Sequence, residues 1–182
     1  MTRDLTFILG GARSGKSAHA ERLAGESGLP VTYIATARIG DDEFAARVRH
    51  HRARRPAHWR LVEAPLDLAG ALIAADRAGH CVLIDCLTLW LANLLFSQDA
   101  MNDDIAVLPP AAQHAFDALD AALASVQGKV VVVSNEIGLG VVPLGSVTRL
   151  YVDELGRLNQ RVAAASARAT LMVAGLPVAL KG

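Results

Sequence analysis

Residues 10–17 read GGARSGKS and match the pattern G-x-x-x-x-G-K-[ST], which ends in a lysine and a hydroxyl residue. An apolar run at residues 5–9 precedes this segment, and an amphipathic stretch at residues 16–26 overlaps its end. Strand, glycine-rich loop and helix in this order bind phosphate, because successive backbone N–H groups and the helix N-terminus face one anion. The lysine of such a loop reaches the β- and γ-phosphates of a nucleotide, and the hydroxyl after it holds Mg²⁺. The residues expected to form this loop are Gly10, Gly11, Ala12, Arg13, Ser14, Gly15, Lys16 and Ser17.

The rest of the chain repeats the alternation of apolar runs and amphipathic stretches. Continuous apolar strands separated by helices indicate a parallel sheet covered by helices on both faces. The tail at residues 171–181 contains Gly175-Leu-Pro and is expected to close the sheet as an antiparallel pair. The sequence thus predicts one α/β domain over residues 1–182, of P-loop NTPase type. The expected strands are residues 5–9, 31–35, 81–84, 129–134 and 170–174, and the expected helices are residues 16–26, 41–54, 66–78, 87–97, 111–126 and 147–167.

Composition narrows the class of protein. Of the 182 residues 52% are hydrophobic and 20% charged, which is typical of a packed globular chain. Eighteen basic residues balance eighteen acidic ones, so no global charge draws the protein to nucleic acid or to a membrane. The most apolar helix candidate, residues 87–96, is too short to span a bilayer. We therefore expect no nucleic-acid partner and no membrane insertion.

The two cysteines bear on the compartment. Cys81 and Cys86 lie in one strand-like run, where they would point to opposite faces about 16 Å apart. A disulfide cannot bridge that distance. Free thiols suit a reducing cytosol, and the N-terminus shows no signal-peptide pattern. The sequence predicts a cytoplasmic protein.

An acidic residue follows the apolar run at residues 81–84. Asp85 would emerge at the carboxyl edge of the sheet, where open α/β sheets bind their ligands. A carboxylate there holds Mg²⁺ together with Ser17, directly or through water. An aspartate in this position is also compatible with simple capping of the next helix.

A second informative segment, residues 41–55, reads DDEFAARVRHHRARR. On a helix, Phe44, Val48 and His51 share one face and five arginines surround it. A neutral histidine is a competent nucleophile toward phosphorus, and the arginines would neutralise a departing pyrophosphate. The residues alone are more typical of a solvated basic face with incidental histidines. A zinc site is disfavoured, because no cysteine or histidine partners sit at ligand spacing.

Several motifs together resemble one known family. They are GGARSGKS at 10–17, AE at 20–21, YIAT at 33–36, DDE at 41–43, HH at 50–51, RPAHWR at 55–60, NEIGLGVVP at 135–143 and GRLNQR at 156–161. With these motifs, in order from about residue 5 to the C-terminus, the chain resembles the bifunctional adenosylcobinamide kinase / adenosylcobinamide-phosphate guanylyltransferase family of cobalamin biosynthesis.

The resemblance implies two reactions that use GTP, ATP or both, with Mg²⁺. One phosphorylates adenosylcobinamide, and the other transfers GMP from GTP onto that phosphate, with His51 as the residue that carries GMP covalently. Lys16 is expected from the phosphate-loop pattern as the second catalytic residue, and the resemblance implies a homotrimer as the assembly. Relatives can carry glutamate at Asp85, which keeps the charge and changes the reach of the side chain. Nucleotide contacts carry over, beyond residues 10–17, to Ala35, Thr36, Ala37, Arg52, Ala53, Arg54, Arg55, Glu63 and Asp85.

Two alternative functions stay open, and so does the role of one segment. A monofunctional P-loop kinase for another small molecule would use Lys16 and Asp85 and leave His51 without a role. A non-catalytic switch would bind nucleotide to order a loop. Asn135 and Glu136, after the strand at 129–134, would hold the corrinoid or position a phosphate, or would form an ordinary turn.

Overall fold

The computed structural model describes residues 4–38, 56–96 and 107–182. Its strands form one seven-stranded sheet in the order β3-β2-β4-β5-β1-β6-β7, parallel except for the antiparallel pairing of β6 with β7. This confirms the predicted α/β class and the C-terminal antiparallel pair. The strands are β1 (Asp4–Gly10), β2 (Val31–Ala35), β3 (Arg60–Glu63), β4 (Cys81–Asp85), β5 (Lys129–Asn135), β6 (Arg168–Val173) and β7 (Leu176–Lys181).

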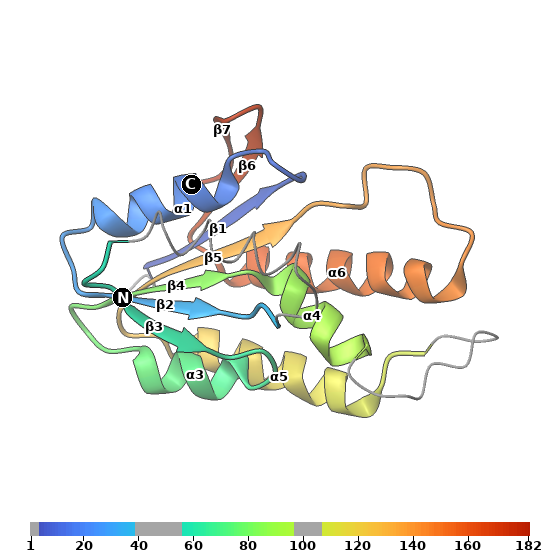
Figure 1. The fold of residues 1–182 in the computed structure, drawn as a ribbon, viewed down its shortest axis with the longest axis horizontal. Helices are drawn as coiled ribbons and strands as arrows, with labels where there is room; N and C mark the ends of the chain where they lie inside the picture. Colours follow the sequence, from blue (N-terminus) through green and yellow to red (C-terminus); the bar gives the residue numbers. More distant parts are fainter. Residues whose placement is uncertain (1–3, 39–55, 97–106) are drawn as a thin grey trace.

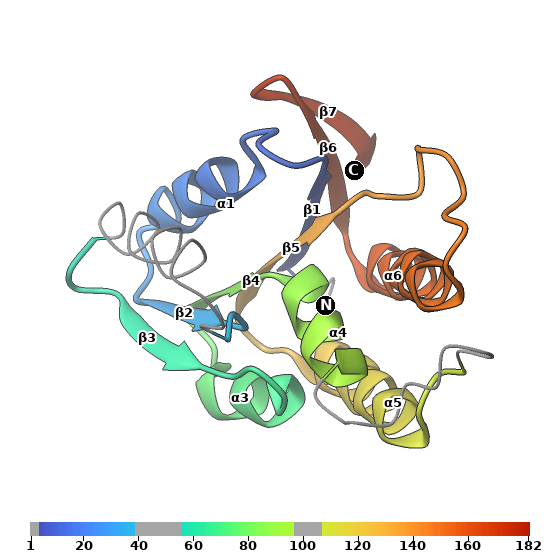
Figure 2. The same cartoon turned by 45° about the vertical axis from the view of Figure 1, so that its right-hand side comes forward.

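Helices cover both faces of the sheet (Figures 1 and 2). Helix α1 (Lys16–Gly25) lies on one face, and α3 (Leu68–Ala75), α5 (Pro110–Ser125) and α6 (Ser146–Ala165) lie on the other. Helix α4 (Leu87–Phe96) follows β4 at the carboxyl edge of the sheet. The predicted helix over residues 41–54 falls outside the described residues. Among the helices within residues 4–38, 56–96 and 107–182, none is long and apolar enough to cross a membrane.

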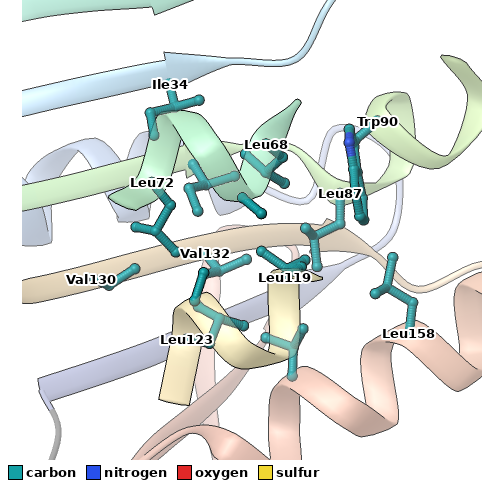
Figure 3. Packing of buried hydrophobic residues seen from close by; sticks show 14 of the residues in the cluster. Ile34, Leu68, Leu72, Leu87, Trp90, Leu119, Leu123, Val130, Val132 and Leu158 are labelled. Carbon is teal, nitrogen blue, oxygen red and sulfur yellow. The ribbon is translucent and has the colours of Figure 1, made fainter. Parts of the chain in front are cut away.

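The strands are apolar without alternation because both of their faces are buried. Along β1, Phe7 packs into the larger core with α3 to α6, while Ile8 packs into the smaller core beside α1. Figure 3 shows the larger core, where Leu72 of α3 and Leu119 of α5 approach Val132 of β5. The two cores therefore bury both faces of the sheet.

One strand was not predicted. β3 pairs only with β2 and is therefore an edge strand, and three of its four residues are exposed. Its sequence RLVE carries a charge at each end and lacks the apolar run by which the other strands were recognised. A short charged edge is a common protection against pairing with other chains.

The two cysteines lie on the same side of the sheet, against the prediction. Both are buried free thiols, and both belong to the smaller core beside α1. The prediction assumed that the strand continues through Cys86, but β4 ends at Asp85 and strand alternation ends with it. Burial raises the pKa of Cys81 to about 11 and that of Cys86 to about 12.

These raised pKa values predict unreactive thiols in the native protein. At pH 8 both thiols should react with a disulfide reagent at least about 10²-fold more slowly than in denaturant, because the native thiolate fraction falls with the pKa shift. The stability that comes from keeping the thiols protonated is complete below their ordinary pKa near 8.5 and is lost as the pH rises towards 11 to 12. Fast native labelling would contradict the burial of both residues.

The larger core offers a matched test of packing on a single helix. Leu72 and Ile73 are neighbours on α3, and their side chains are 0% and 62% exposed. Leu72→Ala should lower the free energy of unfolding by about 2–5 kcal/mol, because it leaves a cavity against α5 and the sheet. Ile73→Ala should change it by about 0.5 kcal/mol or less. Urea denaturation measures both, and equal losses would contradict this packing.

Candidate active site at the carboxyl edge

The predicted phosphate loop, residues 10–17, joins the carboxyl end of β1 to the first turn of α1. Two of its residues adopt left-handed backbone conformations, Arg13 with φ 56° and Gly15 with φ 93°. The N–H of Ser14 donates to the carbonyl of Gly11, at 3.3 Å, which closes the turn. The carbonyl of Gly15 accepts from His19, at 2.9 Å, and starts the helix. This local geometry turns the loop over the N-terminus of α1, as anion binding requires.

The hairpin formed by β6 and β7 packs against the phosphate loop. The N–H of Gly175, in the hairpin turn, donates to the carbonyl of Ser14 at 3.0 Å. A Cβ added to Gly15 would lie 3.2 Å from Cα of Gly175, and one added to Gly10 would lie 2.8 Å from the carbonyl oxygen of Met172 on β6. The glycines at positions 10 and 15 are therefore needed for packing as well as for conformation. Sequence reasoning predicted the hairpin but not its contact with the loop.

Gly15→Ala should weaken nucleotide binding through this packing. The alanine must adopt a φ of 93° and meet the hairpin, so we expect the dissociation constant for a nucleoside triphosphate to rise about 10-fold or more. Gly28→Ala is the matched control, because Gly28 also has a positive φ, 67°, and nothing lies within 4 Å of its added Cβ. That variant should lose stability and keep its affinity. Isothermal titration with both variants separates the two effects, and equal affinities would contradict the packing role of Gly15.

Lys16 lies inside the curve of the loop. Its side chain is half-buried, and Nζ donates to the carbonyl oxygen of Gly11 at 3.0 Å. Burial lowers the pKa of Lys16, while the negative charges of Cys86, when ionised, and of Asp85 oppose that shift. The ammonium and the Asp85 carboxylate are therefore close enough to interact electrostatically. A lysine held by one backbone carbonyl is free to exchange it for a phosphate oxygen.

Asp85 lies in a row of predicted site residues at the carboxyl edge. Ala35, the last residue of β2, pairs in register with Asp85 on one side and with Glu63 on the other. Asp85 is half-buried, and its Oδ2 accepts from the hydroxyl of Tyr33 at 3.0 Å. The sheet thus brings together three residues that are 22 to 50 positions apart in the sequence.

Thr36 joins this row to the start of α4. Its side chain is fully buried, and its hydroxyl donates to the carbonyl of Cys86 at 2.7 Å and accepts from the N–H of Cys86 at 2.9 Å. Its carbonyl accepts from Nδ2 of Asn93 at 2.7 Å. Ala37, the next residue, is half-buried. The hydroxyl of Thr36 therefore fixes the backbone that follows Asp85.

The remaining predicted residues lie outside the described residues: His51, Arg52, Ala53, Arg54 and Arg55. Within residues 4–38, 56–96 and 107–182, no group of three or more His, Cys, Asp or Glu residues could hold a metal. One hydroxyl and one carboxylate, Ser17 and Asp85, nevertheless suit Mg²⁺, which keeps several waters and binds substrate phosphates. The donor set thus fits a nucleotide-bound magnesium ion.

A pocket of about 440 Å³ opens elsewhere, between α5 and α6. It contains no residue of the predicted site. Arg161 in its wall is engaged with Asp117 at 2.6 Å and with Asp120 at 2.7 Å. The site is therefore defined by the carboxyl edge and not by this cavity. The lining residues are Val107, Leu108, Gln113, Phe116, Leu150, Glu154, Arg157 and Arg161.

Comparison with known proteins shows the family to which the chain belongs. Residues 6–180 match the family model described as cobinamide kinase / cobinamide phosphate guanyltransferase. The chain is 55% identical over 180 residues to the bifunctional adenosylcobalamin biosynthesis protein CobP of Pseudomonas aeruginosa, covering 99% of this chain and 98% of that protein. It is 44% identical to the bifunctional adenosylcobalamin biosynthesis protein CobU of Salmonella typhimurium, covering 97% of this chain and 99% of that protein.

Solved structures share the fold at much lower identity. The assembled ATPase EscN of the enteropathogenic Escherichia coli type III secretion system superposes with a TM-score of 0.55 at 12% identity, over 95% of this chain and 43% of that chain. A second type III secretion ATPase of pathogenic bacteria superposes with a TM-score of 0.51 at 11% identity, over 97% of this chain and 56% of that chain. These matches bear on the fold alone and agree with a P-loop NTPase architecture.

Proposed function

Because the chain belongs to the cobinamide kinase / cobinamide phosphate guanyltransferase family and is a bifunctional transferase, we propose that both of its reactions start from a triphosphate held by the phosphate loop. In the first, a nucleoside triphosphate phosphorylates the hydroxyl of adenosylcobinamide. In the second, GMP passes from GTP to the new phosphate and gives adenosylcobinamide-GDP. The observation that carries this proposal is the phosphate loop between β1 and α1, in which Nζ of Lys16 lies 3.0 Å from the carbonyl oxygen of Gly11.

The first reaction depends on charge neutralisation and positioning. Backbone N–H groups of the loop and the N-terminus of α1 face the β- and γ-phosphates, and Lys16 moves its donor from Gly11 to a phosphate oxygen. Ser17 and Asp85 would hold Mg²⁺, which when bound neutralises charge on the transferred phosphoryl group. Tyr33 orients the Asp85 carboxylate through its hydrogen bond.

The second reaction proceeds through a histidine. A ring nitrogen of His51 attacks the α-phosphorus of GTP, the bond to pyrophosphate breaks, and the ring proton is released to solvent. The phosphate of adenosylcobinamide phosphate then attacks the same phosphorus and takes GMP, the bond between phosphorus and the ring nitrogen breaks, and the imidazole regains a proton from solvent. Imidazole suits this role because it is nucleophilic at neutral pH and forms a reactive phosphoramidate. Arg52, Arg54 and Arg55 follow His51 in the sequence and supply positive charge for pyrophosphate.

The other predicted contacts complete the proposal. Ala35, Thr36, Ala37 and Glu63 border the nucleotide at the ends of β2 and β3, and Ala53 lies within the arginine segment. We place both reactions in the cytoplasm, as the two free thiols suggest, and expect a homotrimer. Sedimentation equilibrium tests the assembly.

A two-stage assay tests the function. The protein, with Mg²⁺, is mixed with adenosylcobinamide and either ATP or GTP, and the corrinoid products are followed by mass spectrometry. We expect a gain of one phosphate first and, with GTP, a further gain of GMP. A product that stops at the phosphate would support the monofunctional kinase. Binding of nucleotide with no corrinoid product would support the non-catalytic switch.

A further inference from the structure

Asn135 is a polar residue at the site to which the reactions above assign no task. It is the last residue of β5, the strand that lies between β1, with the phosphate loop, and β4, with Asp85. Asn135 pairs in register with Gly10, and Val133, two residues earlier, pairs with Asp85. The N–H of Glu136 donates to the carbonyl of Gly10 at 3.1 Å. Asn135 therefore lies at the carboxyl edge between the phosphate grip and the proposed metal ligand.

The backbone of Asn135 is fixed by side chains from two helices. Its N–H donates to Oγ1 of Thr88 on α4 at 2.8 Å, and its carbonyl accepts from Nδ2 of Asn159 on α6 at 3.0 Å. Thr88 and Asn159 are each only 6% exposed. The hydroxyl of Tyr151 on α6 in turn donates to the carbonyl of Thr88 at 2.9 Å. Such buried bonds locate residue 135 relative to the phosphate loop much more firmly than a surface turn would.

The side chain of Asn135 has an unused acceptor. The residue is half-buried, and its Oδ1 is buried without a hydrogen-bond partner among the residues described. A buried amide oxygen without a donor is destabilising, so an apolar residue would be more stable here if packing were the only requirement. Rotation of the side chain towards the carboxyl edge would relieve that cost if a ligand brought a donor. A hydroxyl group is such a donor, and phosphate oxygens are not.

We propose that Asn135 accepts a hydrogen bond from the attacking hydroxyl of the corrinoid in the kinase reaction, and that Asn159 and Thr88 act as positioning residues for it. This inference rests on the proposed function. The amide oxygen orients the hydroxyl so that an oxygen lone pair faces the γ-phosphorus. As the new O–P bond forms, the bond between the γ-phosphorus and the β-phosphate oxygen breaks, and the hydroxyl proton passes to an oxygen of the transferred phosphoryl group. The amide neither gains nor loses a proton.

The proposed role of Asn135 applies to the kinase reaction and not to GMP transfer. In GMP transfer the attacked atom is the α-phosphorus, and the corrinoid then offers a phosphate without the hydroxyl proton that Asn135 would hold. Asn135→Ala should therefore lower kcat of the kinase reaction about 10²-fold, the order expected for lost alignment of a nucleophile. The dissociation constant of the nucleotide and the rate of covalent GMP labelling from GTP should change by much smaller factors. Loss of a purely structural residue would lower both rates and raise the dissociation constant together.

Two further variants sharpen the test. Ser134→Ala is the matched control, because Ser134 precedes Asn135 on β5 and its fully buried hydroxyl also lacks a partner in the described part of the chain. This control should retain the kinase rate of the wild type. Thr88→Val removes the acceptor for the N–H of Asn135 and keeps the side-chain shape, so it should lower the kinase kcat in the same selective way. It also serves as the test if Asn135→Ala does not fold.

The outcomes distinguish this inference from the proposed function. A kinase rate that stays within about 3-fold of the wild type in Asn135→Ala overturns the inference, as does an equal loss in both reactions with a lower melting temperature. If the wild type itself makes neither corrinoid product, the proposed function fails before any variant is measured. A selective loss of the kinase reaction, shared by Thr88→Val and absent from Ser134→Ala, supports the role of Asn135.

Discussion

Replacing Lys16 with alanine should lower kcat/KM of the kinase reaction by at least about 10²–10³-fold, the cost of losing one preorganised donor to a transition-state oxygen. Lys16 is the one lysine of the phosphate loop, and its Nζ is already placed inside the curve of the loop by its bond to Gly11. Alanine leaves the backbone N–H groups in place, so part of the nucleotide affinity should remain. Coupled assay of nucleoside diphosphate release, with adenosylcobinamide as acceptor, measures the effect.

Lys129→Ala is the matched control for charge. Lys129 begins β5, at the opposite edge of the sheet from Asn135 and the phosphate loop, so its loss removes the same charge without touching the site. If the kinase rate of Lys16→Ala stays within about 10-fold of the wild type, Lys16 does not hold the triphosphate as proposed. Lys16→Ala also tests whether one loop serves both reactions. If this variant loses GMP labelling as well as phosphorylation, a single triphosphate site is indicated.

The pKa of Lys16 adds a pH dependence to this experiment. Burial lowers the pKa in the free protein, so the lysine loses its proton at a lower pH than a free lysine does. Phosphate binding requires the ammonium, and nucleotide affinity should therefore fall as the pH rises through this lowered value. In Lys16→Ala that decline should be absent, which titration calorimetry over an alkaline pH series can measure.

Much of the fold was predictable because its strands are buried on both faces. A central parallel strand such as β5 must be apolar at every position to pack against helices on each side, and a run such as VVVV therefore identifies it. β3 lacks that requirement, since it lies at the edge and three of its residues are exposed. The cysteine prediction was wrong for a related reason, because alternation of faces holds only until the strand ends at Asp85.

Only the part of the site that is formed by consecutive residues could be predicted from the sequence. The phosphate loop consists of eight consecutive residues, so its motif can be recognised from the sequence alone. In the structure it lies between β1 and α1, as expected. The neighbours of that loop depend on strand order, which short patterns do not encode. The row of Glu63, Ala35 and Asp85, and the contact of Gly175 with Ser14, arise from pairings between distant segments. The position of Asn135 beside Gly10 has the same origin.

Replacing His51 with asparagine should abolish covalent labelling of the protein by GTP that is radiolabelled at the α-phosphate. Asparagine keeps a polar side chain of similar size and lacks the nucleophilic ring nitrogen, so the phosphoramidate cannot form. The label on the wild type, formed with Mg²⁺, should be labile in acid and stable in alkali. Phosphorylation of adenosylcobinamide should stay measurable in the variant, because a hydroxyl and not the histidine attacks the γ-phosphorus in that reaction.

The adjacent histidine provides the control that makes this result specific. His50→Asn replaces the same kind of side chain one position earlier, and in the helix predicted over residues 41–54 position 50 would lie about 100° around the axis from position 51. Labelling should persist in that variant. If the label survives in His51→Asn and disappears in His50→Asn, the first histidine carries GMP. If it appears only with γ-labelled nucleotide, the protein transfers a phosphoryl group to itself, and the histidine-linked GMP mechanism is wrong. If His51→Asn loses the label, His50→Asn keeps it and both still phosphorylate the corrinoid, then His51 serves GMP transfer and is not required for the kinase reaction.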